Sequence, residues 1–167
     1  SEVFTKPHPN RVCAVCFSAD SRRVLSASWD RVVRVFDVDG GNALMTLRGH
    51  SDVVYSVSCT NDGALIATVS WDGSLRLWDA KTGAEIWKYD GHGAEVRCVT
   101  FNYNGTRIAT SYKDGSLRVF SVQERRLLHE VGAHGSAYSC AFSNDSRLIA
   151  SGGGGGDLIL FDAETLD

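Results

Sequence analysis

The sequence predicts an all-β fold made of repeated four-stranded antiparallel sheets. The first observation is a histidine that recurs every 42 residues, at His8, His50, His92 and His134. The second is that each repeat divides into short apolar or alternating runs separated by turn residues, which is typical of strands. The third is that no stretch keeps the 3.6-residue apolar period of a long helix. Phased copies of this length indicate stacked structural units.

The second repeat displays the expected order of strands most clearly. Its runs cover residues 53–58, 65–70, 74–78 and 84–89. The Asp72-Gly73 pair between two alternating runs is a strong hairpin signal. The first two runs are apolar or small on both faces and the fourth is mixed and charged, so the inner strands should be buried between neighbouring sheets. Radial stacking of such sheets predicts a β-propeller.

The repeats account for the whole chain, residues 1–167, as one propeller segment. We expect an outer strand at residues 1–6, because this stretch matches the fourth-strand segments at residues 43–48 and 85–90. The repeats then cover approximately residues 7–48, 49–90, 91–132 and 133–167. The chain therefore carries four blades' worth of sequence.

Composition and charge exclude several classes of protein. The chain has 167 residues, 43% of them hydrophobic, which is a globular composition. No apolar run approaches the ~20 residues of a membrane span, and no signal peptide is visible at the start. An odd count of five cysteines in apolar runs indicates reduced thiols, so we expect an intracellular protein, cytoplasmic or nuclear. A net charge of -3 disfavours generic binding to nucleic acid.

Two short motifs carry no cofactor or metal site. Cys13 and Cys16 form a C-x-x-C, but three positions apart on a strand their side chains point to opposite faces. The glycine run at residues 152–156 occupies a hairpin position and is followed by a strand-like run, not by the helix that a phosphate loop requires. We therefore expect no metal and no cofactor.

The residues resemble a known family. The dipeptides Gly49-His50, Gly91-His92 and Trp78-Asp79, with a period of 42, resemble the WD-repeat family of β-propellers. Phe36-Asp37 and Phe161-Asp162 are variants of the third dipeptide. The resemblance covers essentially the whole chain.

The resemblance implies a buried hydrogen-bonded tetrad of His, Ser or Thr, Asp and Trp in each blade. The members carried over are His50, Thr68, Asp72 and Trp78 in the second repeat, His8, Ser26 and Asp30 in the first, His92, Thr110 and Asp114 in the third, and His134 and Ser151 in the fourth. Phe36 and Phe120 replace Trp, and Gly155 stands at the fourth Asp position, so the fourth blade should be the least rigid.

These residue types also suggest a Ser-His-Asp catalytic triad. An active site is normally present once, whereas these residues recur in every repeat. We therefore interpret them as structural and expect no enzymatic activity.

The resemblance further implies a docking face on one rim, lined by residues at the start of each first strand and by the residue before each turn Asp. The candidate protein-binding residues are Arg11, Trp29, Val53, Tyr55, Trp71, Glu95, Arg97, Lys113 and Tyr138. Hairpin tips are normally polar, so Trp29 and Trp71 at equivalent tips favour a contact surface. Trp, Tyr and Arg are also the types enriched in binding hot spots. The alternative is that each indole only packs over the neighbouring blade.

We interpret the chain as a non-enzymatic scaffold that docks a protein or peptide partner on this rim, with no small-molecule substrate and no membrane. The alternatives are a purely architectural subunit of a large assembly, for example cytoskeletal or ciliary, and a nucleic-acid-associated WD-repeat protein. Steep salt dependence of binding would distinguish the last.

The number of blades leaves three arrangements open. The family resemblance implies about seven blades in a ring. The chain is therefore expected to be part of a larger, seven- or eight-bladed propeller, and further blades would come from the same longer chain. The alternatives are two copies paired as halves of an eight-bladed ring, and a closed four-bladed ring in which residues 1–6 complete the fourth blade.

Overall fold

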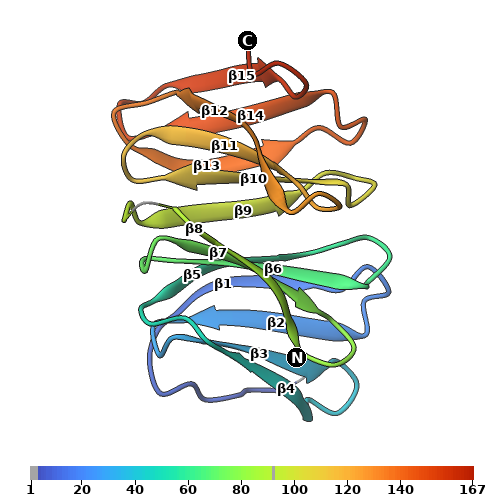
Figure 1. Cartoon of the computed structure of the whole chain (residues 1–167). Coiled ribbons are helices and arrows are strands. Elements are labelled where there is room, and N and C mark those ends of the chain that lie inside the picture. Colours follow the sequence, from blue (N-terminus) through green and yellow to red (C-terminus); the bar gives the residue numbers. More distant parts are fainter. Residues whose placement is uncertain (1–3, 92) are drawn as a thin grey trace.

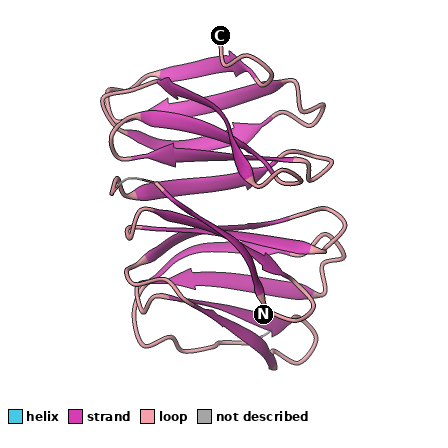
Figure 2. Ribbon diagram, viewed as in Figure 1, coloured by secondary structure: helices cyan, strands magenta, loops and turns pink. Residues whose placement is uncertain are grey.

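A computed structural model describes residues 4–91 and 93–167, and this part of the chain is built from strands joined by turns (Figure 2). Four antiparallel sheets follow one another along the chain and lie in a row (Figure 1). This confirms the predicted all-β fold of four-stranded blades, which forms part of a β-propeller.

The strands follow the chain in simple order within each sheet. The first sheet contains β1 (Val12–Phe17), β2 (Arg23–Ser28), β3 (Val32–Asp37) and β4 (Ala43–Arg48). The second contains β5 (Val54–Cys59), β6 (Leu65–Ser70), β7 (Ser74–Asp79) and β8 (Glu85–Asp90). The third contains β9 (Val96–Phe101), β10 (Arg107–Tyr112), β11 (Ser116–Ser121) and β12 (Arg126–Gly132). The fourth contains β13 (Ala137–Phe142), β14 (Leu148–Gly153) and β15 (Leu158–Asp162).

The tight turn between the second and third strand of each sheet needs a residue with positive φ. Gly73, Gly115 and Gly156 supply it, with φ of 82°, 90° and 90°. In the first sheet Arg31 occupies the same position with φ 73°, a conformation that costs a residue with a side chain more than it costs glycine. The first repeat therefore departs from the others at the turn that carries its Asp.

Burial between the sheets creates three successive cores. Val33 and Val35 of the first sheet pack with Val54 and Val57 of the second. The same pattern joins the second sheet to the third and the third to the fourth. Because both faces of an inner sheet are covered, β6 and β10 are almost wholly buried, as their uninterrupted apolar and small residues predict.

The row of sheets is open. The first and fourth sheets lie at opposite ends of the row (Figure 1). The alternative of a closed four-bladed ring is therefore wrong for this structure, because the inner strands of consecutive sheets pack in sequence without returning to the first.

The expected outer strand at residues 1–6 lies partly outside the described residues, at positions 1–3. Its described part, residues 4–6, forms no strand. Phe4 and Lys6 lie against Gly41 at the β3–β4 turn of the first sheet. Residues 4–6 thus pack on the first sheet, while β15 lies at the far end of the row.

Replacing Leu75 by alanine should destabilise the chain by ~2–5 kcal/mol, because this side chain is fully buried in the core between the second and third sheets. Urea unfolding at a fixed protein concentration measures the change. The control Lys81→Ala, in the exposed β7–β8 turn, should stay within ~0.5 kcal/mol of the wild type. Equal losses in the two variants would contradict the assigned core.

Candidate functional site

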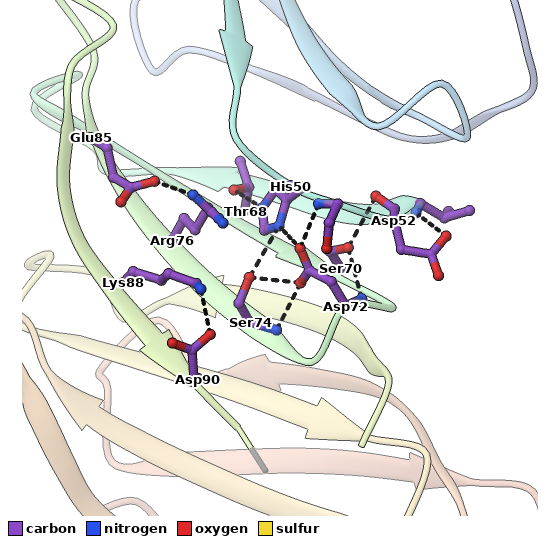
Figure 3. Close-up of polar contacts among 12 residues, drawn as sticks. His50, Asp52, Thr68, Ser70, Asp72, Ser74, Arg76, Glu85, Lys88 and Asp90 are labelled. Carbon is purple, nitrogen blue, oxygen red and sulfur yellow. Dashed lines mark hydrogen bonds and ion pairs between the residues drawn. The ribbon is translucent and has the colours of Figure 1, made fainter. Parts of the chain in front are cut away.

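The second sheet brings its four predicted tetrad residues together, and Figure 3 labels three of them, His50, Thr68 and Asp72. His50 Nδ1 donates to Asp72 Oδ2 at 3.0 Å, and Thr68 Oγ1 donates to His50 Nε2 at 2.7 Å. Trp78 Nε1 in turn donates to Thr68 Oγ1 at 2.9 Å. The carboxylate accepts from one ring nitrogen, which leaves the other free to accept from the threonine. The chain of bonds ties the turn before β5 to β6, β7 and the β6–β7 turn.

A fifth residue, Ser74, joins this network and was not among the predicted members. Its hydroxyl donates to Asp72 Oδ1 at 2.7 Å and lies 3.2 Å from His50 Nδ1. Burial opposes ionisation of Asp72, but hydrogen bonds from His50, Ser74 and the Ser51 amide outweigh it and hold the pKa of Asp72 well below its usual range. Ser116, 42 residues further on, binds Asp114 in the same way at 2.7 Å. The period of 42 was the signal that could have found both serines.

The first sheet forms only part of the corresponding network. Ser26 Oγ lies 2.7 Å from His8 Nε2, but Asp30 pairs with Arg34 Nη1 at 2.7 Å instead of with His8. Val32 stands where the second sheet has Ser74, so no hydroxyl holds the carboxylate toward the histidine. The predicted triple of His8, Ser26 and Asp30 is therefore brought together only as a pair.

In the third sheet a buried arginine, Arg118, lies beside the residues predicted for the network. The predicted His92 lies outside the described residues, and Thr110 Oγ1 donates to the carbonyl of Arg118 at 3.5 Å. The Arg118 side chain, 5% exposed, lies 3.1 Å from Glu130 and 3.8 Å from Asp114. Its guanidinium also stacks 4.0 Å over the Tyr112 ring. A buried charge of this kind is tolerated because carboxylates and an aromatic face surround it.

The arginine recurs at the same position in three sheets. Arg34, Arg76 and Arg118 are spaced by 42 residues and each forms an ion pair with an acidic residue. Arg76 pairs with Glu85 of the outer strand β8 (Figure 3). This series was visible in the sequence but was not singled out there.

The fourth sheet keeps two members, and one of them lacks a partner. His134 Nε2 lies 3.1 Å from Ser151 Oγ. Within the described part of the chain, the buried His134 Nδ1 has no hydrogen-bond partner. Gly155, immediately before the turn glycine, occupies the position of Asp72, so the acceptor is missing. A buried donor without an acceptor costs ~1–3 kcal/mol.

These networks are poorly placed for catalysis. The hydroxyl-bearing residues Ser26, Thr68 and Ser151 are 5, 0 and 1% exposed. A nucleophile must be reachable by its substrate, and these lie between packed strands. The arrangement instead cross-links strands within one blade.

The rim lies at the start of the first strand of each sheet, and each of these strands carries a β-bulge there. The strand pairing skips Cys13, Tyr55, Arg97 and Tyr138 in the four sheets. A bulge redirects a side chain out of the regular alternation. Three of these four residues are among the predicted rim residues.

A backbone hydrogen bond beside each bulge fixes the rim geometry. The amides of Trp29, Trp71, Lys113 and Gly154 donate to the carbonyls of Arg11, Val53, Glu95 and Ser136 at 2.9, 3.0, 2.9 and 2.9 Å. Each hairpin tip is thus tied to the start of the first strand of its own sheet. The strand-start residues and the hairpin-tip residues therefore stand at equivalent positions in the four sheets.

Aromatic side chains join the first and second sheets at this rim. The rings of Trp29 and Trp71 lie 5.3 Å apart, and Tyr55 stacks on Trp71 at 5.7 Å. The Arg11 guanidinium lies 5.0 Å over the Trp29 ring. Val53 is only 6% exposed, so its side chain offers little surface to a partner. We call Arg11, Trp29, Tyr55 and Trp71 the aromatic cluster.

Charged side chains continue the rim over the third and fourth sheets. Lys113 Nζ lies 2.6 Å from Glu95 Oε1, and Arg97 lies 3.9 Å from the same carboxylate. The Arg97 guanidinium sits 4.2 Å over the Tyr138 ring. A hydrogen bond from Arg97 and its positive charge lower the pKa of the Tyr138 hydroxyl. We call Glu95, Arg97, Lys113 and Tyr138 the charged cluster; it holds two cations and one carboxylate.

Comparison with known proteins places the repeats in a family. The family model of the WD domain, G-beta repeat, matches residues 2–37, 41–79, 83–121 and 125–162. The chain is a WD-repeat protein. WD repeats generally mediate protein–protein interaction, and the family is generally non-enzymatic.

One curated relative is the peroxisomal targeting signal 2 receptor of Mus musculus, 43% identical over 53 residues. The match covers 30% of this WD-repeat chain and 17% of the length of the receptor.

Residues 4–91 and 93–167 contain neither a membrane-spanning helix nor a cluster of metal ligands. No helix there is long and apolar enough to cross a bilayer. In the same residues no group of three or more His, Cys, Asp or Glu side chains is placed to hold a metal ion.

Replacing Asp72 by asparagine should lower the free energy of unfolding most near neutral pH. The folded pKa of Asp72 lies below the unfolded value of ~3.9, so its ionised form stabilises the fold above about pH 4 and this contribution fades as the pH falls. The gap between wild type and variant should therefore narrow below about pH 4. Denaturant unfolding across the pH range measures it. A gap that stays constant down to low pH would contradict the assignment. The control Asp157→Asn, at an exposed position, should change stability at neutral pH by less than ~0.5 kcal/mol.

Restoring the missing acceptor should stabilise the fourth sheet. Asp157 stands where the second sheet has Ser74, and its carboxylate would lie 3.1 Å from a Cβ at Gly155. The double variant Gly155→Asp with Asp157→Ser should gain ~0.5–1.5 kcal/mol by pairing His134 Nδ1. Thermal unfolding compares it with Gly155→Asp alone, which should gain less because two carboxylates then meet. The control Gly155→Ala supplies no acceptor; a gain there equal to that of the double variant would refute the mechanism.

Proposed function

We propose that this WD-repeat chain is a non-enzymatic interaction scaffold that docks a segment of a protein or peptide partner on the rim formed by the aromatic and charged clusters. The observation that carries the proposal is the stack of Trp29, Trp71 and Tyr55 at the tips of two neighbouring sheets. Large aromatic residues at turn tips are unusual, since tips face water, and they are common in binding hot spots.

The contrast between two tryptophans supports a binding role for the cluster. Trp78 is 3% exposed and its indole N–H donates to Thr68, so its place in the fold is fully accounted for. Trp71 is only half-buried, and within the described residues its Nε1 has no hydrogen-bond partner. The fold uses the ring of Trp71 for stacking, and its Nε1 is itself buried, so a partner would meet the half-exposed ring.

The two clusters together suggest the chemistry of the partner. The indole faces of Trp29 and Trp71 suit an apolar or cationic side chain. Arg97 and Lys113 exceed the charge of Glu95, so a carboxylate of the partner fits the charged cluster. A segment with an apolar anchor followed by an acidic residue would meet both. The printed name of the mouse relative, a receptor for a targeting signal, is in keeping with recognition of a short segment.

The competing scaffold role is a purely architectural one, in which the sides of the blades make the contacts and the rim makes none. The two roles predict different effects of rim substitutions on the affinity for a partner. Only docking on the rim makes binding depend on Trp29 and Trp71.

Replacing Trp71 or Trp29 by alanine should weaken binding of peptides by about thirtyfold or more, because truncation of a hot-spot aromatic typically costs at least ~2 kcal/mol. The probes are peptides selected from a random library on the immobilised wild-type chain and then labelled with a fluorophore. Fluorescence anisotropy measures their dissociation constants. Repeating the titration at higher salt separates this mode from nucleic-acid-like binding, whose affinity falls steeply with salt.

The matched control is Tyr103→Ala. Tyr103 is 65% exposed in the β9–β10 turn, away from the two clusters. It should leave the dissociation constants within about twofold, and the circular dichroism of all three variants should match the wild type. Peptides that bind Trp29→Ala and Trp71→Ala as tightly as the wild type would refute docking on the aromatic cluster.

A further inference from the structure

Four of the five cysteines lie in pairs between neighbouring sheets. The first strands β1 and β5 lie side by side, as do β9 and β13 (Figure 1). Cys16 of β1 and Cys59 of β5 both pack against the core between the first and second sheets. Cys98 of β9 and Cys140 of β13 both belong to the core between the third and fourth sheets. All four are free thiols, and neither the polar networks nor the rim uses them.

In the first pair the two thiols interact from one strand to the next. Cys59 Sγ donates to the carbonyl of Phe17, the residue after Cys16, at 3.1 Å. The interaction with the Cys16 thiol lowers the pKa of Cys59, and the same interaction raises the pKa of Cys16. A thiol beside a thiolate can donate a hydrogen bond to it, so one member of the pair ionises more easily and the other less easily.

The second pair has the same arrangement. Cys98 Sγ donates to the carbonyl of Cys140 at 3.5 Å. The Cys140 thiol lowers the pKa of Cys98 to about 7 in spite of burial, while Cys98 and burial raise the pKa of Cys140. The thiolate is the nucleophilic form of cysteine. Each pair therefore contains one activated sulfur and one facing thiol.

Cysteine occupies both positions of such a pair or neither of them. The first strands are equivalent, so the same positions recur in each contact between sheets. The equivalent pairs are Ala14 with Val57, Ser56 with Val99, Ser58 with Phe101, and Thr100 with Phe142. Ser56 and Val99 show that such positions meet, because the Val99 amide donates to Ser56 Oγ at 3.3 Å. A cysteine that serves only as a small apolar residue does not require a second cysteine opposite it.

The activated sulfur of each pair is within reach of a small oxidant. Cys59 and Cys98 are partly exposed, although both lie in sheets that have a neighbour on each side, whereas Cys140 is only 5% exposed. Cys59 also lines a surface pocket of about 280 Å³, together with Asn61. A molecule the size of hydrogen peroxide can therefore reach Cys59 and Cys98 first.

We propose that each pair is a site of reversible oxidation by hydrogen peroxide, which joins neighbouring sheets through a Cys16–Cys59 and a Cys98–Cys140 disulfide. The thiolate of Cys59 or Cys98 attacks one peroxide oxygen, the O–O bond breaks, and the other oxygen leaves as hydroxide and takes up a proton. The sulfenic acid that results is then attacked by the facing thiol, Cys16 or Cys140. The S–S bond forms as the S–O bond breaks, and the oxygen leaves with the thiol proton as water. In total two thiols lose two electrons, and one peroxide gives two waters.

Each disulfide adds a covalent link to a contact that otherwise consists of side-chain packing. Cys16 and Cys59 are 43 positions apart and Cys98 and Cys140 are 42 apart, so each link closes a long loop and restricts the unfolded chain. The second link also lies next to the rim, because Cys98 directly follows Arg97. Oxidation should therefore stabilise the stack of sheets.

Peptide mapping of the whole oxidised chain tests the proposal. The folded wild type is treated with hydrogen peroxide, alkylated with iodoacetamide and digested with trypsin without reduction. Two linked pairs of peptides are expected: residues 12–22 with 49–76, and residues 98–107 with 127–147. Fragment ions should place the first link at Cys16 and not at Cys13. The count of free thiols should fall from five to one, because four thiols pair, and dithiothreitol should restore all five.

Serine variants separate the two pairs. Cys59→Ser should lose its own link and keep the Cys98–Cys140 link, and Cys140→Ser should do the reverse. The matched control is Cys13→Ser, at the rim beside Trp29, which should form both links at the wild-type rate. Oxidation should raise the midpoint of thermal unfolding of the wild type by about 5 °C or more. The double variant of Cys59→Ser and Cys140→Ser should show no such shift.

Three results would overturn the proposal. Loss of thiols without linked peptides would mean that single cysteines are oxidised to sulfenic or sulfinic acid only. Links between separate copies, seen as a dimer on a non-reducing gel, would mean that the thiols of one chain do not meet. Links that form in urea but not in the folded chain would mean that the contact holds the sulfurs apart. Circular dichroism should show that each serine variant folds, and the mapping of the wild type stands without them.

Discussion

The packing of one sheet on the next is the contact on which the rest of the molecule depends. A four-stranded sheet of this sequence has apolar residues on both faces, and a neighbour on each side removes both faces from water, as in the second and third sheets. In each core the first strand of one sheet meets the third strand of the preceding sheet. Both strands contribute valines or leucines in the first two cores, whereas in the third Cys140 of β13 meets Leu117 and Val119 of β11. The polar networks and the rim are arranged around this stack.

The polar networks serve the single blade, and their differences follow from single residues. In the second sheet Asp72, Ser74 and Thr68 surround His50, and Trp78 donates to Thr68. In the fourth a glycine at the Asp position leaves His134 Nδ1 unpaired within the described chain. The third sheet holds Arg118 among Glu130, Asp114 and Tyr112. Sheets with the same strand order are therefore stabilised by different side-chain hydrogen bonds and ion pairs.

The strands within the repeats could be predicted from the sequence, because alternation of apolar residues and turn residues are local signals. The period of 42 then showed which residues are equivalent between repeats. It also placed His50, Thr68, Asp72 and Trp78 in one group, and the structure brings these four within hydrogen-bonding distance. It could not predict that Asp30 would turn to Arg34, since that choice depends on the valine at position 32 and on the turn at Arg31. The openness of the row was also beyond local signals, because the rotation between blades is set by packing over the whole contact.

The bulge at the start of each first strand lets rim side chains be substituted in evolution without loss of the rim geometry. Each rim side chain is held by a backbone bond within its own sheet, and its identity plays no part in that bond. The rim positions of the third and fourth sheets already hold Lys113 and Gly154 where the first two hold tryptophan. The side chains that contact a partner can therefore be substituted in one blade at a time, while the backbone that holds the rim positions stays the same.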